Sequence, residues 1–220
     1  KNNAKINEWK VADPRIEPIL IAASIPRGGN QEVALEMLRG VAHAQNDIME
    51  DFESKCIIKD KNNGKETYKY KAECKDGIKG RPLQIMIVDD SNDKDIAIEI
   101  AKYLVNNPDV LAVIGHNSSE VSSKAAIEYQ KGKLVMVTPT SFALKFEPLK
   151  YASPASTDKN FIYAAAYSHE LLADKIVEEM KLQLNPDKPK ILLCYDGSAF
   201  DQNAFAESFR IIADNKKEIE

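Results

Sequence analysis

Hydroxyl and amide side chains gather directly after an apolar run in the middle of the chain. The segment Gly115 to Ser119 includes His116, Asn117 and Ser118, and a stretch of helical period follows it at once. Backbone N–H groups and serine hydroxyls at a helix start attract an anion such as a carboxylate. Ser118 and Ser119 are therefore candidates for ligand binding. A plain N-cap at Asn117 or Ser118 explains the same residues, and the sequence leaves both interpretations open.

A second polar group follows the next apolar run. It contains Thr138, Pro139, Thr140 and Ser141. The carboxyl ends of parallel strands meet at one edge of a sheet, so this loop is expected beside the loop that ends at Ser119. Together they predict two walls of a polar binding site. The alternative is a proline-containing turn whose hydroxyls bind only water.

The sequence lacks the common patterns of catalysis and of metal binding. His43, His116 and His169 are far apart and show no metal-ligand spacing. Neither a nucleophile elbow nor a glycine-rich nucleotide loop is present. Asp89 and Asp90 are expected to form a turn and cap the helix that follows, and His116 to pack or hydrogen-bond. We therefore predict no enzymatic activity, no cofactor and no metal ion.

Short runs rich in Ile, Val and Leu alternate with longer segments of helical period. This alternation is typical of βαβ units and predicts an α/β fold with a mostly parallel sheet. The predicted strands cover residues 18–24, 83–88, 110–114, 134–137 and 190–195, and the predicted helices cover residues 33–52, 94–106, 119–130, 161–180 and 199–213.

The same pattern suggests how the chain is divided. We expect an N-terminal extension at 1–16, a first α/β lobe at 17–145, and a crossover with the start of a second lobe at 146–220. Residues 55–81 are polar, carry turn residues and are predicted to be a surface insertion or hairpin. The second lobe shows a single strand, which cannot form a sheet alone. We expect either that it joins the first sheet or, as we favour, that the natural protein continues past Glu220.

Composition narrows the class of protein. Of the 220 residues, 44% are hydrophobic and 29% are charged, which is typical of a folded globular protein. The formal net charge is −4, and Lys and Arg are scattered, so we predict no nucleic acid and no anionic membrane as partner. The start of the chain lacks a hydrophobic signal core, which indicates that any targeting segment has been removed.

The three cysteines are Cys56, Cys74 and Cys194. The first two flank the polar stretch with turn residues, whereas Cys194 lies in an apolar run. A disulfide between Cys56 and Cys74 and a pair of free thiols both fit this arrangement. The disulfide would indicate an oxidising compartment.

Taken together, several segments resemble the type I solute-binding proteins of ABC importers. They are residues 113–119 (VIGHNSS), 132–141 (GKLVMVTPTS), 77–83 (GIKGRPL) and 89–93 (DDSND). The resemblance covers about residues 17–215 and is strongest to the leucine/isoleucine/valine-binding branch. It implies two doubly wound parallel-sheet lobes, the second incomplete in this chain, and a periplasmic or extracellular location, with or without a membrane anchor. Such a compartment favours the Cys56–Cys74 disulfide.

The resemblance also implies roles for individual residues. Ser119 would bind the α-carboxylate of an amino acid through its hydroxyl and N–H, and Thr140 would offer a backbone carbonyl to the ammonium group, with Ser141 beside it. Phe142 stands where the family often has Thr. Phe200 falls where an aromatic residue closes over the ligand from the second lobe, and simple packing is the rival explanation.

Two functions follow from this resemblance. The first is binding of a small polar solute, an amino acid or related zwitterion, for delivery to a membrane permease. The second is a ligand-sensing ectodomain of the same fold, joined to a membrane signalling module. An enzyme on the same scaffold would need a catalytic acid, base or cofactor loop, which the sequence does not offer.

Overall fold

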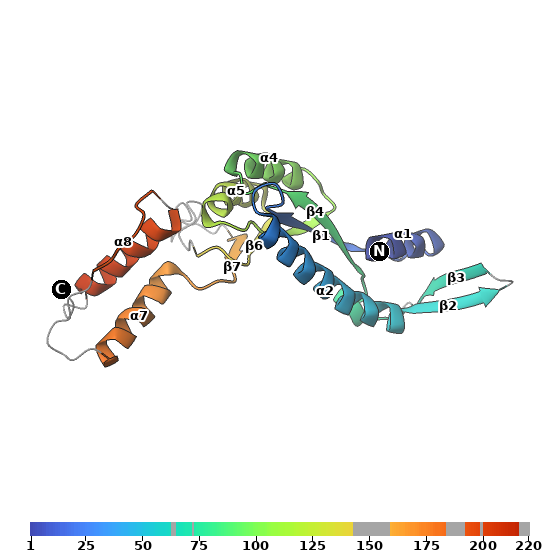
Figure 1. Cartoon of the computed structure of the whole chain (residues 1–220). Helices are drawn as coiled ribbons and strands as arrows, with labels where there is room; N and C mark the ends of the chain where they lie inside the picture. Colours follow the sequence, from blue (N-terminus) through green and yellow to red (C-terminus); the bar gives the residue numbers. More distant parts are fainter. Residues whose placement is uncertain (63–64, 72, 143–158, 184–191, 199, 216–220) are drawn as a thin grey trace.

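A five-stranded parallel sheet forms the centre of the molecule (Figure 1). The computed structural model describes residues 1–62, 65–71, 73–142, 159–183, 192–198 and 200–215. The strand order is β4-β1-β5-β6-β7, and all neighbouring strands are parallel. The strands are β1 (Ile19–Ile25), β4 (Leu83–Asp89), β5 (Val110–Ile114), β6 (Val135–Thr138) and β7 (Ile162–Ala164).

Both faces of the sheet are covered by helices. Alternate residues of β1 point to opposite faces, as the period of a strand requires. Ala22 packs in a core with the helices α4 and α5, whereas Ala23 packs in a separate core with apolar side chains of α2. The α/β fold predicted from the sequence is therefore confirmed. The helices are α2 (Gln31–Cys56), α4 (Lys94–Val105) and α5 (Ser119–Gly132).

The order of the strands defines where a ligand is expected. β1 is followed by β4 on one side and then, through α4, by β5 on its other side. The direction of winding thus reverses between β1 and β5. In open α/β sheets ligands bind outside the carboxyl ends of the strands at such a switch point, which here is the edge that carries the loop after Ile114.

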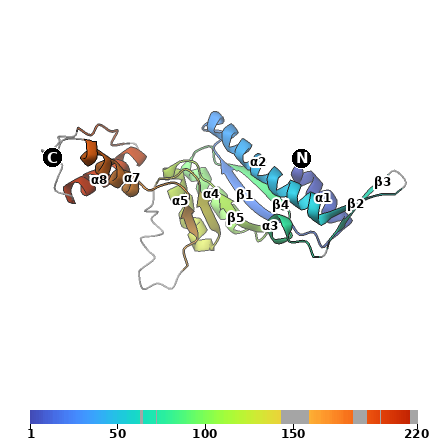
Figure 2. The same ribbon diagram turned by 90° about the horizontal axis from the view of Figure 1, so that it is seen from below.

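The first sixteen residues are more than an extension. They contain helix α1 (Asn2–Ala12), whose Ile6 and Trp9 are buried together with Phe52 of α2. Trp9 also contacts Tyr68 of the hairpin, with ring centroids 6.5 Å apart. This cluster, which we call the satellite core, joins α1 and the end of α2 to the hairpin. It lies beyond the amino ends of the strands (Figures 1 and 2).

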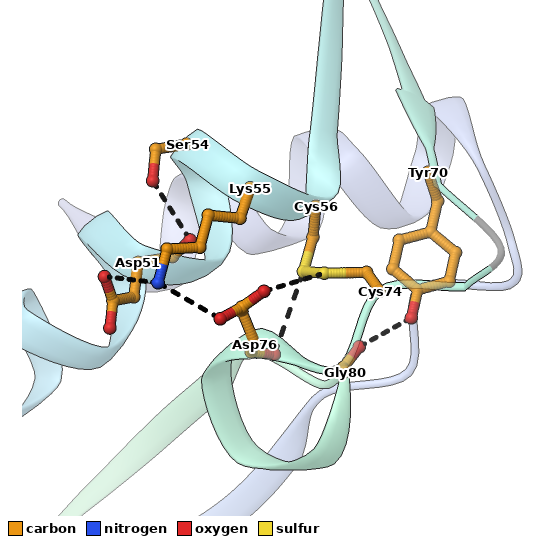
Figure 3. The surroundings of a disulfide bond; sticks show 8 residues. All are labelled: Asp51, Ser54, Lys55, Cys56, Tyr70, Cys74, Asp76 and Gly80. Carbon is orange, nitrogen blue, oxygen red and sulfur yellow. Dashed lines mark hydrogen bonds and ion pairs between the residues drawn. A yellow bond between two sulfur atoms is a disulfide. The ribbon is translucent and has the colours of Figure 1, made fainter.

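The polar stretch at 55–81 forms an antiparallel hairpin and a short turn of helix. The elements are β2 (Ile57–Asn62), β3 (Lys65–Tyr70) and α3 (Asp76–Lys79). Cys56 and Cys74 are bonded, with Cα atoms 5.3 Å apart, and Cys56 is fully buried in the satellite core (Figure 3). The hydroxyl of Tyr70 donates to the carbonyl of Gly80 at 2.8 Å. The hairpin is thus fixed at its base on both strands.

Two predicted elements after residue 158 are wrong. Residues 162–164 were expected in a helix but form β7, which pairs with β6 and completes the first sheet. The helix α7 (His169–Gln183) begins later, where the Ser168 hydroxyl accepts the N–H of Leu171. Spacing alone could not separate these elements, because Phe161 and Ala165 happen to continue the apolar period of the helix.

The predicted strand at 190–195 is also absent from its described part, residues 192–195. Leu192 is 88% exposed, and Cys194 is exposed with a free thiol. An apolar run becomes a strand only where a neighbouring strand is available, and no described residue pairs with this one. Helix α8 (Phe200–Asn215) was predicted correctly and packs on α7 through Ala173, Val177 and Phe209.

Helices α7 and α8 lie at the opposite end of the molecule from the hairpin (Figures 1 and 2). The boundary expected at 145/146 and most of the expected crossover lie outside the described residues. Strand β7, which lies within the range expected for the second lobe, belongs to the sheet of the first.

Candidate functional site

The loop between β5 and α5 lies at the carboxyl edge of the sheet, at the switch point. Ser118 is the N-cap of α5, and its hydroxyl accepts the N–H of Val121 at 3.4 Å. The N–H of Ser122 donates to the Ser118 carbonyl at 2.9 Å. The first N–H groups of a helix have no partner within it, so those of Ser119 and Glu120 remain available. The capping role of Ser118 and a ligand role for the helix start are therefore compatible.

Ser119 joins this loop to the one that follows β6. Its side chain is almost fully buried, and its hydroxyl oxygen accepts the N–H of Phe142 at 3.2 Å. A second contact runs between the same loops, from the hydroxyl of Thr140 to the carbonyl of Asn117 at 2.6 Å. The two polar loops expected from the sequence to be neighbours do lie side by side.

Ser141 has the most unusual environment among these residues. Its side chain is fully buried, and its hydroxyl has no hydrogen-bond partner within the described residues. Its N–H donates to the hydroxyl of Thr138 at 3.3 Å. Leaving a buried hydroxyl without a partner costs about 1–3 kcal/mol, so such groups are often explained by a ligand or a water molecule.

Phe142 links the second loop to the helices at the other end of the molecule. Its ring is 41% exposed and stacks on the His169 imidazole, with centroids 5.9 Å apart. His169 in turn meets the ring of Phe205 edge-on at 6.4 Å. Phe200 is the first residue of α8, and its side chain lies outside the described part of the chain. The aromatic contact from α8 to the loop therefore runs through Phe205, which the sequence did not single out.

A buried polar network supports the first loop from beneath. Asp90 accepts hydrogen bonds from the Ser24 hydroxyl at 2.8 Å and from Nδ1 of His116 at 2.6 Å. Nε2 of His116 lies 3.3 Å from the hydroxyl of Tyr129. All four side chains are completely buried. The 2.6 Å distance fits a proton on Nδ1 of His116 that is donated to the carboxylate of Asp90.

The electrostatics of the network are set by burial and by the histidine. Burial alone would raise the pKa of Asp90, but the hydrogen bond and the charge of His116 outweigh it and hold this pKa below its ordinary value. Burial, together with the charge of Asp90, raises the pKa of Tyr129 above its usual range. Asp90 is therefore an anion and Tyr129 a neutral phenol near neutral pH.

This network positions the loop and has no geometry for nucleophilic catalysis. Ser24 and Asp90 both lie at Nδ1 of His116, and the other ring nitrogen faces Tyr129. In a catalytic triad the serine contacts one ring nitrogen of the histidine and the acidic residue contacts the other, which is not the arrangement found here. The carbonyl of His116 also accepts the hydroxyls of Ser122 and Thr138, each at 3.1 Å. The strand ends and both loops are thus locked around one residue, and His116 is the buried hydrogen-bonding residue expected.

The capping role expected of Asp89 and Asp90 is wrong. Asp93 caps α4 instead, since its carboxylate accepts the N–H groups of Asp95 and Ile96. Asp89 and Asp90 do form a turn, through the N–H groups of Ser91 and Asn92. The side chain of Asp90 is occupied by the buried network, which depends on pairing between distant segments.

Gly115 is required where the first loop leaves β5. Its φ of +135° lies in a region that residues with a side chain rarely adopt. A Cβ atom there would also lie only 2.9 Å from the Ser24 Cβ and from the Ser24 carbonyl oxygen. The close approach of this loop to β1 is what brings His116 within reach of Asp90.

The comparisons with known proteins agree with this geometry. A model of the periplasmic binding protein family matches residues 31–216. The chain belongs to this family of extracytoplasmic solute-binding proteins, as the resemblance had suggested. The sheet and its helices form one lobe of the type I fold, and the second lobe is incomplete. No curated protein sequence is significantly similar to the chain.

Solved structures of the same fold belong to ABC transporters. An ABC transporter substrate-binding protein from Desulfitobacterium hafniense is 21% identical, with a TM-score of 0.68 over 92% of this chain and 48% of that one. A second structure from that organism, in complex with Leu, is 20% identical, with a TM-score of 0.65 over 92% of this chain and 49% of that one.

The branched-chain amino acid binding protein LivJ from Streptococcus pneumoniae, in complex with isoleucine, is 15% identical, with a TM-score of 0.63 over 93% of this chain and 47% of that one. The chain therefore spans about half the length of the solved structures it matches. At these identities the likeness establishes the fold.

The described residues contain neither a membrane-spanning helix nor a cluster of metal ligands. None of their helices is long and apolar enough to cross a membrane. No three His, Cys, Asp or Glu side chains among them are grouped so as to hold a metal ion.

Proposed function

We propose that the two loops at the carboxyl edge bind the carboxylate and ammonium groups of an amino acid or related zwitterion. The whole protein acts outside the cytoplasm and delivers this solute to an ABC permease in the membrane. The observation that carries this proposal is the start of α5. There the N–H groups of Ser119 and Glu120 have no partner in the helix, and the Ser119 hydroxyl lies against the second loop.

A carboxylate suits this position for three reasons. The helix start carries a partial positive charge. The two available N–H groups supply donors, and Ser119 Oγ, which accepts from Phe142, keeps its own proton to donate. The nearby Glu120 carboxylate would repel an anion, but it is exposed and lies 3.5 Å from the ammonium group of Lys94.

The ammonium half of the ligand is assigned to the second loop. The hydrogen bond from the Thr140 hydroxyl to the Asn117 carbonyl holds this turn against the first loop. We propose that the backbone carbonyl of Thr140 accepts a hydrogen bond from the ammonium group. The hydroxyl of Ser141, which has no hydrogen-bond partner among the described residues, adds a polar group beside it. Phe142 is proposed to contribute its exposed ring. The relatives solved with leucine and isoleucine support a ligand of this class.

Calorimetric titration of the full two-lobed protein tests the proposal. The panel contains the common amino acids and, for each binder, the matching amine without a carboxylate and the matching acid without an ammonium group. We expect at least one amino acid to bind and both of its analogues to bind at least tenfold more weakly, since each loses charge-assisted hydrogen bonds. Equal binding of amine and amino acid would remove the proposed role of α5.

A further inference from the structure

Positive charge is concentrated in the hairpin region, residues 55–81. This segment contains nine basic and four acidic residues, an excess of five positive charges. The whole chain has a net charge of −4, so the remaining residues carry −9. The scattered charges of the whole chain predicted no nucleic acid and no anionic membrane as partner, but the positive charges of this region are locally separated from the negative remainder.

The hairpin region projects from the molecule at the amino ends of the strands. Figures 1 and 2 show β2 and β3 at one extremity, with the sheet between them and helices α7 and α8. The ligand loops are at the carboxyl ends of the same strands. A partner bound to the hairpin would therefore leave the proposed ligand site open.

Some basic residues of this region already have partners. Lys55 is paired with Asp51 and Asp76, Lys59 with Glu53, and Lys61 with Glu66. The guanidinium of Arg81 donates to the carbonyls of Glu17 and Pro18. Within the described part of the chain, no ion pair neutralises the other exposed ammonium groups, which belong to Lys69, Lys71, Lys75 and Lys79.

The two faces of the hairpin differ in character. On the inner face Ile57, Tyr68 and Tyr70 pack in or against the satellite core. On the outer face Lys69 lies opposite Ile58, which is 45% exposed. Lys71, which is also exposed, directly follows the last residue of β3.

The base of the hairpin adds further lysines next to this outer face. Three lysines and two acidic residues line a shallow depression of about 550 Å³ beside Cys74: Lys55, Lys71, Glu73, Lys75 and Asp76. The disulfide and the bond from Tyr70 to Gly80 hold this base in place (Figure 3). Lys69 lies on β3, Lys71 directly follows that strand, and Lys75 and Lys79 lie at the two ends of α3, so the exposed lysines of this region gather around the base of the hairpin.

We propose that this basic patch, made of Lys69, Lys71, Lys75 and Lys79, binds the anionic headgroups of a phospholipid bilayer. Lysines act as flexible point charges, which suits a diffuse layer of negative charge. A phosphopeptide or a nucleic acid would favour arginine forks or stacking aromatic rings, and the exposed outer-face residues described here offer neither. The half-exposed Ile58 can rest at the headgroup boundary.

Cosedimentation of the 220-residue chain with vesicles tests this inference without any knowledge of the solute. We expect binding to vesicles of phosphatidylcholine mixed with phosphatidylglycerol, little binding to phosphatidylcholine alone, and a marked loss at high salt. Lys69→Glu together with Lys71→Glu should weaken binding by about thirtyfold or more, since each basic residue near such a surface contributes about fivefold.

A matched control separates the patch from the overall charge. Lys124 and Lys159 are exposed residues outside the hairpin, and Lys124→Glu with Lys159→Glu changes the net charge by the same amount. We expect this variant to bind like the wild type. Fluorescence of the buried Trp9 verifies that both variants keep the satellite core. Absence of binding to the anionic vesicles at low salt, or equal loss in both variants, would overturn the proposal.

Discussion

Breaking the Cys56–Cys74 disulfide should destabilise the satellite core by about 3 kcal/mol. The bond closes a loop with a sequence separation of 18, and the loss of chain entropy in the unfolded state for a loop of that size corresponds to about this free energy. With an m-value of about 2 kcal/mol per molar urea, the unfolding midpoint should fall by about 1.5 M. Chemical reduction breaks the disulfide but keeps both cysteine side chains, so it measures the effect of the bond without creating a cavity.

Trp9 makes this change easy to follow. It is the single tryptophan of the chain and is buried in the same cluster as Cys56, so its fluorescence reports on this region. The background should carry Cys194→Ser, because that exposed thiol would otherwise exchange with the disulfide.

Cys56→Ala with Cys74→Ala should show the same loss plus about 1 kcal/mol for the cavity at the fully buried Cys56. A midpoint that stays the same on reduction would refute the role given to this bond.

Two further changes probe the support beneath the first loop. Asp90→Asn should lower the free energy of unfolding by about 3 kcal/mol at neutral pH, because it removes one partner of a buried pair. Asp90 has a depressed pKa in the folded state, so its ionised form contributes stability above the unfolded pKa of about 4 and loses it as pH falls through the folded pKa. The free energies of unfolding of the wild type and this variant, measured by urea titration, should therefore converge below pH 4. A difference that stays constant with pH would contradict the stabilising role of the ionised Asp90. Gly115→Ala should lower the free energy of unfolding by about 3 kcal/mol, because Gly115 has a φ of +135° and lies close to Ser24. Calorimetric unfolding measures this change. A free energy of unfolding within about 0.5 kcal/mol of the wild type would show that the loop adapts to the added methyl group.

The repeated elements of the lobe could be predicted because each carries its own local signal. Residues 18–24 and 110–114 are short apolar runs, and the helices between them show an apolar face with helical period. These segments became β1, β5 and the intervening helices with shifts of at most two residues at their ends, except that α2 ends at Cys56, four residues later than expected. The position of Ser118 at a helix start was equally local, since a serine before a periodic segment is a common cap.

The network beneath the site could not be predicted in this way. Ser24 and Asp90 are 66 residues apart in sequence, and Asp90 and His116 are 26 apart. Only the order of the strands brings them together, and the same residues read locally indicated a helix cap at Asp90. Strand β7 was missed for a related reason, because its three residues are stabilised by pairing with β6 rather than by their own pattern.

The measurement that tests the central claim most directly is the dissociation constant of the preferred amino acid for Ser119→Ala in the full two-lobed protein. We expect this dissociation constant to rise by about tenfold to a hundredfold, which corresponds to about 1.5–3 kcal/mol for a hydrogen bond to a carboxylate. Ser54→Ala, which removes an exposed hydroxyl on α2, is the matched control and should leave the affinity unchanged. An unchanged dissociation constant in a correctly folded Ser119→Ala protein would contradict the assignment of this site.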